Sequence, residues 1–184
     1  MGRPKNFSRE EVLEKAMPVF WKHGFADTSL QELERATGVN KSGLYTEFRD
    51  KEDLFVACLR HYLETQGKRG LLTKEPLGWK NVEMFLKNGP LSRGEQQGCF
   101  SVSSMREFAI LPDEAYRVVT ENRALLRHFL AMNIEAEKPK LAPAAIAEMV
   151  LSFFSGLCIE LNLKSGKTSS TRKIQNFMTA LRSL

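Results

Sequence analysis

Apolar side chains recur at the three-to-four-residue spacing of amphipathic helices along nearly the whole chain. No alternating stretch is long enough to predict a β-strand. Glycine and proline residues break the pattern at 67–78, at 89–98, near 139–143 and at 166. The pattern therefore predicts an all-α protein of about nine helices, with a small N-terminal unit followed by a larger helical bundle.

The first helix is expected to begin after Ser8 and to end near Gly24. Ser8 and Glu11 have the spacing of a capping box, in which serine and glutamate each accept from the other's backbone N–H. Pro18 lies inside this helix, deletes one backbone hydrogen bond and is expected to kink it. The inward stripe is Val12, Leu13, Ala16, Met17, Phe20 and Trp21.

Residues 28–51 predict two short helices joined by a turn. The first begins at residue 28 or 29, and the second runs from about residue 41 to 48. Gly38 takes a positive φ without strain, so the chain can reverse between them. Val39 and Leu44 are apolar and can pack the second helix against the first. This is a helix-turn-helix pattern, in which the second helix enters a DNA groove.

The second helix presents a small, polar and basic surface that we expect to face DNA: Lys41, Ser42, Gly43, Tyr45 and Thr46. Early residues of such a helix reach the major groove, where Lys41 can donate to the O6/N7 edge of guanine. A glycine inside a helix costs about 1 kcal/mol relative to alanine. We interpret Gly43 as a close approach to the DNA backbone; the alternative for the whole surface is an ordinary solvated face.

Further contacts are expected around this helix. Tyr45 and Lys51 are predicted to bind phosphates, joined by Thr28 at a helix N-terminus. Gln31 either reaches a base or is a plain surface glutamine. Arg3 and Lys5 belong to an N-terminal arm that either enters the adjacent minor groove or carries incidental charge.

The 184-residue chain has a net charge of +5, which agrees with nucleic-acid binding. Basic and acidic residues balance over 1–60, however, which disfavours a DNA-packaging protein with a broad basic surface. The N-terminus has no apolar stretch resembling a signal peptide. The longest apolar stretch, at 149–161, is interrupted and shorter than the roughly 20 residues of a membrane span. We expect a cytoplasmic protein without a membrane partner.

Enzyme signatures are missing from the sequence: there is no glycine-rich phosphate loop, no His-Glu-x-x-His and no Gly-x-Ser-x-Gly. The three histidines fall on different predicted helices without a neighbouring acid. We therefore predict no enzymatic activity, no catalytic residue, no metal and no cofactor.

A set of short motifs spans residues 7 to about 60: Phe20-Trp21-x-x-Gly24-Phe25, Thr28-Ser29-Leu30, Gly38-Val39, Gly43-Leu44-Tyr45 and Phe48-x-x-Lys51-Glu52-x-Leu54. This combination resembles the TetR family of bacterial transcriptional repressors. Beyond residue 60 the resemblance is in layout. It implies a helix-turn-helix DNA-binding domain at 1–50 and a ligand-binding and dimerisation bundle at 51–184. It also implies a homodimer that leaves an inverted-repeat operator when a small molecule binds.

The bundle holds more aromatic side chains than packing needs, and a few are expected to line a cavity for a small apolar effector. The candidates are Phe55, Leu59, Tyr62, Phe85, Phe100, Met105, Phe108 and Tyr116. Arg106, Glu107 and Asn122 are polar groups that can orient a ligand. The last two predicted helices, at 144–163 and 170–184, are expected to form the dimer interface, and closing the monomer core is the alternative, chiefly for the earlier helix.

Three separated cysteines, Cys58, Cys99 and Cys158, do not support a disulfide framework. Cys58 and His61 share one helix face, and Cys99 is a possible third ligand or a redox-sensitive thiol. The alternative hypothesis is therefore a metal- or oxidant-sensing repressor. Buried cysteines usually behave as small hydrophobes instead.

Overall fold

The computed structural model describes residues 7–65, 69–88, 91–93, 96–161 and 167–184. The α-helices are α1 (Arg9–His23), α2 (Leu30–Thr37), α3 (Lys41–Glu47), α4 (Lys51–Thr65), α5 (Arg69–Leu72), α6 (Trp79–Asn88), α7 (Phe100–Ser104), α8 (Asp113–Glu135), α9 (Pro143–Glu160) and α10 (Lys167–Leu181). A 3-10 turn, η1 (Met105–Glu107), follows α7. The predicted all-α class with an N-terminal helix-turn-helix is confirmed.

Two short strands occur where the sequence predicts only a break. β1 (Leu91–Arg93) and β2 (Gln96–Gly98) form an antiparallel pair, with Leu91 opposite Gly98. Gly98 has a φ of +94°, and an added Cβ would lie 2.6 Å from the carbonyl oxygen of Cys158 in α9. Glycine therefore lets this hairpin lie close against α9.

Capping boxes start α1 and α2. Ser8 donates its backbone N–H to Glu11 at 2.7 Å, and Ser29 donates to Glu32 at 2.8 Å, while each serine hydroxyl accepts in return. These bonds from the serine backbone and hydroxyl lower the pKa of both carboxyls, because they favour the ionised form. The capping box predicted for the first helix is confirmed, and α1 continues through Pro18 to His23.

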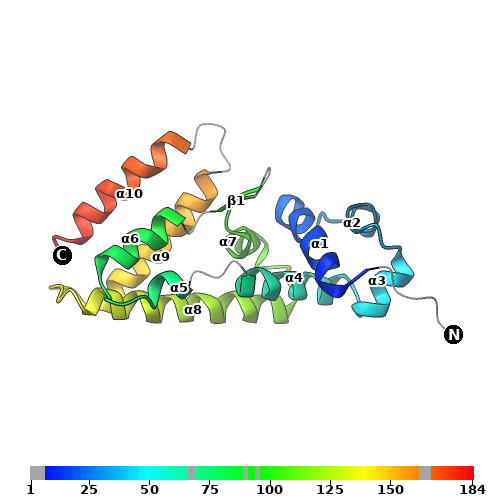
Figure 1. The fold of residues 1–184 in the computed structure, drawn as a ribbon, viewed down its shortest axis with the longest axis horizontal. Coiled ribbons are helices and arrows are strands. Elements are labelled where there is room, and N and C mark those ends of the chain that lie inside the picture. Colours follow the sequence, from blue (N-terminus) through cyan, green and yellow to red (C-terminus); the bar gives the residue numbers. More distant parts are fainter. Residues whose placement is uncertain (1–6, 66–68, 89–90, 94–95, 162–166) are drawn as a thin grey trace.

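The helix-turn-helix and the bundle lie at opposite ends of an elongated molecule (Figure 1). α1 packs on α2 and α4, and α4 in turn packs on α8, so α4 contacts both parts. Phe100 of α7 connects the two parts. The centroid of its ring lies 5.9 Å from that of Trp21, 5.7 Å from that of Phe55 and 5.8 Å from that of Tyr62. The apolar core is thus continuous between the two ends. The division at residue 50 stays a prediction.

The last helix completes the core of its own chain. Ile174, Met178 and Leu181 of α10 are buried, and the ring of Phe177 stacks on that of Phe153 with centroids 3.9 Å apart. The expectation that α10 offers an unpaired apolar stripe to a second subunit is therefore wrong. Its amphipathic spacing shows that one face is buried, but not which surface covers it.

α9 has the length and apolar composition of a membrane-spanning helix, and is the one such helix among the described residues. Seven of its side chains are buried in the bundle, including Ile146, Val150 and Phe154. Its opposite face is exposed and carries Ala145, Met149, Ser152, Gly156 and Ile159. These five residues are called the α9 outer face below.

Candidate nucleic-acid interface

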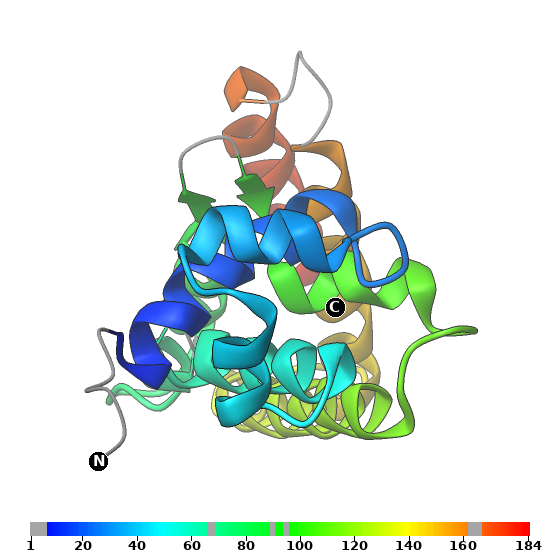
Figure 2. The same cartoon turned by 90° about the vertical axis from the view of Figure 1, so that its right-hand side faces the viewer.

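α3 begins with two side-chain caps. The Asn40 side chain accepts from the backbone N–H of Gly43 at 2.8 Å, and the Glu34 carboxylate accepts from that of Lys41. Gly38 has a φ of +72°, the left-handed conformation that ends α2 and turns the chain. The short helix-turn-helix sequence thus supplies its own stops and starts. Seen from the end of the molecule, α2 and α3 lie nearest the viewer (Figure 2).

One face of α3 is buried and the other is open to solvent. Leu44 and Phe48 are buried, as their apolar character predicts. The exposed side chains, together with Gln31 of α2, are called the recognition surface below: Gln31, Lys41, Ser42, Tyr45 and Thr46. This arrangement brings together five of the residues proposed from the sequence to contact DNA.

The recognition surface has internal order. The Lys41 ammonium lies 5.8 Å from the centroid of the Tyr45 ring, which is 40% exposed. Thr46 donates its hydroxyl to the carbonyl oxygen of Ser42 at 2.9 Å. Tyr45 therefore keeps its ring at the surface beside a cation, where both groups can meet an incoming polyanion.

Gly43 is required by packing inside the protein. A Cβ added there would lie 2.7 Å from a methyl carbon of Val39 and 3.2 Å from the cap oxygen of Asn40. The structure thus gives Gly43 a steric reason within the helix-turn-helix, and its close approach to DNA stays a prediction.

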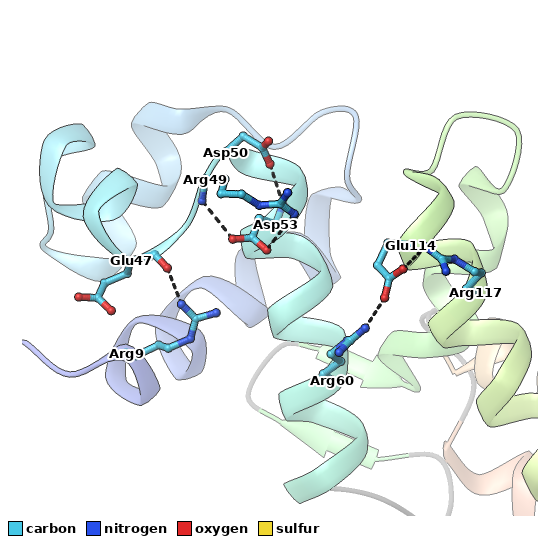
Figure 3. Close-up of polar contacts among 8 residues, drawn as sticks. All are labelled: Arg9, Glu47, Arg49, Asp50, Asp53, Arg60, Glu114 and Arg117. Carbon is cyan, nitrogen blue, oxygen red and sulfur yellow. Dashed lines mark hydrogen bonds and ion pairs between the residues drawn. The ribbon is translucent and has the colours of Figure 1, made fainter.

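Arg9 fixes the far end of α3. Its guanidinium donates to the carbonyl oxygen of Glu47 and lies 4.2 Å from the centroid of the Phe48 ring (Figure 3). A cation at a helix C-terminus is favourable because the last carbonyls carry partial negative charge. The spacing of residues in the sequence does not place Arg9 under α3.

Arg49 follows α3 and is the basic residue that the site prediction left out. Its side chain is 85% exposed, and its guanidinium lies 3.6 Å from the Asp53 carboxylate. Asp53 also accepts from the Arg49 backbone N–H at 3.0 Å (Figure 3). The pair holds Arg49 at the start of α4, beside the recognition surface.

Lys51 points into the protein. Its ammonium donates to the carbonyl oxygens of Phe25, Ala26 and Thr28, at 2.9, 3.4 and 3.0 Å. An ammonium has three donors, so all of them are used inside the chain. The predicted phosphate contact of Lys51 is thus replaced by a hold on residues 25–28, the loop before α2.

Thr28 is also turned inward. It is buried, and its hydroxyl donates to the carbonyl oxygen of Gly24 at 2.6 Å. Its hydroxyl therefore orders the same loop instead of facing a phosphate, contrary to the prediction. Arg3 and Lys5 lie outside the described residues.

A small cavity of about 30 Å³ lies between α7, α8 and α9. Its lining includes Val102, Met105, Asn122, Leu126 and Ser155. A larger groove of about 690 Å³ lies on the other side of Asn122, between α4, α5 and α8. Asn122 therefore lines both the groove and the small cavity.

Of the eight residues predicted to bind a ligand, Met105 lines this cavity. Phe108 and Tyr116 contact each other at 4.9 Å near the surface. The others are buried packing residues: Phe55, Leu59, Tyr62, Phe85 and Phe100. Aromatic density located the core of the bundle, whereas the lining of the cavity is mostly aliphatic and polar.

The metal- or thiol-sensing alternative finds little support at Cys58 and His61. Burial raises the pKa of the Cys58 thiol and so disfavours the thiolate that binds metals. Its sulfur lies 3.9 Å from the carbonyl oxygen of Leu13, and His61 pairs with Glu14 at 2.7 Å. Within the described ranges, no three side chains of His, Cys, Asp or Glu gather as a metal site.

Comparisons with known proteins agree with this geometry. The family model "Bacterial regulatory proteins, tetR family" matches residues 12–58, which include α2 and α3. The HTH-type transcriptional repressor ComR of Escherichia coli K12 is 51% identical over 113 residues, or 56% of this chain and 52% of ComR. The matched segment thus spans about half of that repressor. The uncharacterized HTH-type transcriptional regulator YezE of Bacillus subtilis is 41% identical over 64 residues, covering 35% of this chain and 33% of YezE.

A solved structure extends the likeness to the whole fold. A cysteine mutant of the TetR family transcriptional regulator CifR, complexed with 26bp double-strand operator DNA, superposes with a TM-score of 0.84. The superposition covers 97% of this chain and 99% of the other, at 23% sequence identity. The helix-turn-helix match and the shared fold lead to one conclusion: residues 12–58 form a helix-turn-helix segment of the kind found in the tetR family of bacterial regulatory proteins, within a chain that has the fold of CifR.

Proposed function

We propose that this protein is a homodimeric transcriptional repressor in the cytoplasm, without enzymatic activity. It binds an inverted-repeat operator and leaves it when a small apolar molecule enters the bundle. The observation that carries the proposal is the recognition surface, where exposed side chains of α2 and α3 gather at one end of the molecule. The first turn of such a helix reads base edges in the major groove.

Phosphate anchoring belongs in this account to exposed groups around α3. Arg49 is exposed, and the Tyr45 hydroxyl belongs to a side chain that is 40% exposed to solvent. Contacts to phosphates set the register of the helix, while Lys41, Ser42 and Gln31 are placed to read bases. The names of the relatives support the proposed binding to DNA, since ComR is a transcriptional repressor and CifR was solved on operator DNA.

The α9 outer face supports the dimer. Its residues lie three or four positions apart along one side of the helix, and they are small or apolar. Met149 is 44% and Ile159 is 52% exposed, while Gly156 has no atom within 4 Å of an added Cβ. A two-fold axis along this face would let two copies of α9 approach closely, and the same symmetry matches an inverted repeat.

The effector is proposed to open the cavity at Met105. Ligand sites for small molecules usually measure about 300–1,000 Å³, far more than this cavity offers. A ligand must therefore bind a conformation in which the cavity is wider. It shifts the protein toward that conformation only as far as it prefers it, by about 1.4 kcal/mol for each tenfold preference in affinity. The lining combines apolar side chains with the polar groups of Asn122, Arg123 and Ser155, which favours a largely apolar molecule that also carries hydrogen-bonding groups.

The test is selection of bound DNA from a random pool by the purified full chain. Recovery of an inverted repeat, bound by two copies of the protein, is the expected result. A pool without an enriched sequence, or a protein that binds all duplexes equally, would overturn the proposal.

A further inference from the structure

Glu107 of η1 holds the loop that precedes α2. Its carboxylate accepts from the backbone N–H of Phe25 at 2.7 Å and from that of Ala26 at 2.9 Å. The two amides belong to consecutive residues, so one carboxylate satisfies both through its two oxygens. These residues lie 81 or more positions apart in sequence, and the contact joins the bundle side of the molecule to the helix-turn-helix side.

The loop is shaped to receive this carboxylate. Gly24 has a φ of +84°, a conformation that side chains other than glycine rarely adopt. An added Cβ at Gly24 would lie 2.5 Å from a carboxylate oxygen of Glu107. Gly24 therefore allows the close approach, both by its backbone conformation and by its missing side chain.

The same loop is held from its other side by Lys51. Glu107 takes two of its N–H groups, and Lys51 donates to three of its carbonyl oxygens. The loop thus has its donors facing the bundle and its acceptors facing α4. The position of α2, which starts directly after this loop, depends on both side chains.

α7 and η1 link this contact to the cavity. Val102 and Met105 line the cavity, whereas Phe100 of the same short helix packs on Trp21, Phe55 and Tyr62. Glu107 follows Met105 by two residues. An element this short moves as a unit, since its two faces are packed against different neighbours and interiors are close-packed.

We propose that Glu107 is the positioning residue through which the cavity controls the helix-turn-helix. Widening the cavity moves α7 and η1, withdraws the carboxylate from Phe25 and Ala26, and releases the loop that sets the place of α2 and α3. This inference rests on the proposed function for its consequence in DNA binding, but the release of the loop stands without DNA. The element that has two states is the loop at residues 24–28, which is either held by the Glu107 carboxylate or released from it.

The experiment uses a larger side chain in place of an effector to push the walls of the cavity apart. Ser155 lines the cavity from α9 and donates its hydroxyl to the carbonyl oxygen of Leu151 at 2.9 Å. Ser155→Leu adds bulk that should press α7 and η1 outward, while the amino-acid sequence of α7, η1 and the loop stays unchanged. Ser155→Val is the milder version if the leucine variant fails to fold.

The first readout is amide hydrogen exchange at Phe25 and Ala26 in the full chain without DNA. We expect Ser155→Leu and Glu107→Gln each to speed exchange about tenfold or more, because both withdraw an acceptor from these amides. Unchanged protection in Ser155→Leu would overturn the inference whatever the outcome with DNA.

The second readout is affinity for the DNA recovered from the random pool. Ser155→Leu is expected to weaken binding about tenfold in the wild-type background and by less than about twofold in the Glu107→Gln background, which is non-additivity beyond that of independent sites. Glu83→Gln is the matched control: like Glu107, Glu83 contacts two donors with its carboxylate, but these are the side chains of Lys87 and Arg182, and Glu83 lies between α6 and α10. In that background Ser155→Leu should keep its full effect.

Equal weakening in the wild-type and Glu107→Gln backgrounds would show that the cavity acts by another route, and no weakening in either would show that it is uncoupled. Both results overturn the inference and leave the proposed function intact. If the pool yields no operator, the proposed function fails, and the exchange experiment alone decides the inference.

Discussion

The ammonium of Lys51 lies 2.9 Å from the carbonyl oxygen of Phe25 and 4.6 Å from the centroid of its ring. One side chain thus holds both the backbone and the ring of a residue 26 positions earlier in the chain. A lysine at the start of α4 looks like a phosphate ligand in the sequence, but in the structure it donates hydrogen bonds to the loop before α2.

Lys51→Met should lower the free energy of unfolding by about 1.5–3 kcal/mol, the range for hydrogen bonds to a charged group. The variant keeps the aliphatic stem but leaves three carbonyl oxygens without their donor. Urea unfolding measures the loss. The slope of log affinity against log salt for operator DNA should match the wild type, and a slope smaller by about one would return Lys51 to the phosphates.

Lys41→Ala should reduce discrimination between the operator and scrambled DNA by about 1–3 kcal/mol, the value of one good base contact. Lys41 is exposed on the first turn of α3, so the change should leave unfolding by urea unaltered. Titrations of both duplexes at several salt concentrations measure it. Equal weakening on operator and scrambled DNA would instead assign Lys41 to a phosphate.

Gly43→Ala has two opposing effects on the free energy of unfolding. Alanine gains about 1 kcal/mol of helix propensity, but its Cβ would lie 2.7 Å from a Val39 methyl carbon in the buried side of the turn. Overpacking of this kind costs about 1–3 kcal/mol, so we expect net destabilisation. Thermal unfolding decides it, with Gly70→Ala as a control that meets no atom within 4 Å. A more stable Gly43→Ala would return this glycine to a role in DNA contact.

Met149→Glu should convert the dimer to monomers, because a charge would be buried on the α9 outer face without a partner. Sedimentation velocity at micromolar concentration measures the change. Ile110→Glu is the matched control, since Ile110 is also exposed, at 57%, but lies between η1 and α8 and does not belong to the α9 outer face. A Met149→Glu variant that stays dimeric would place the interface elsewhere.

The fold class, the helix-turn-helix and the capping box at Ser8 could be predicted because they depend on local sequence: a short polar cap, a glycine turn and helical spacing of apolar residues. The direction in which a polar side chain points could not. Lys51 turns inward because carbonyl oxygens of a loop 23 to 26 positions earlier accept from its ammonium, and Thr28 turns inward because its hydroxyl donates to Gly24 of its own loop. Neither partner leaves a periodic trace in the sequence.

The same limit applies to the bundle. The stripe of α10 is amphipathic, but whether it covers its own chain or a second subunit depends on the placement of α6 and α9. Aromatic density around Phe55 and Phe100 indicates the junction of the two parts, since rings fill large core spaces. The cavity is lined differently, and Glu107 lacks a sequence signal because its two acceptor contacts are to backbone.

In the proposed two-fold dimer, two recognition surfaces lie at a fixed distance from each other. Changing the distance between the two half-sites of the DNA tests this arrangement directly. Affinity is measured for the selected inverted repeat and for the same repeat with about five base pairs inserted at its centre, half a helical turn. For such a dimer we expect the insertion to weaken binding about tenfold or more, because the second half-site moves to the opposite side of the duplex. Equal affinity for the two duplexes would contradict it.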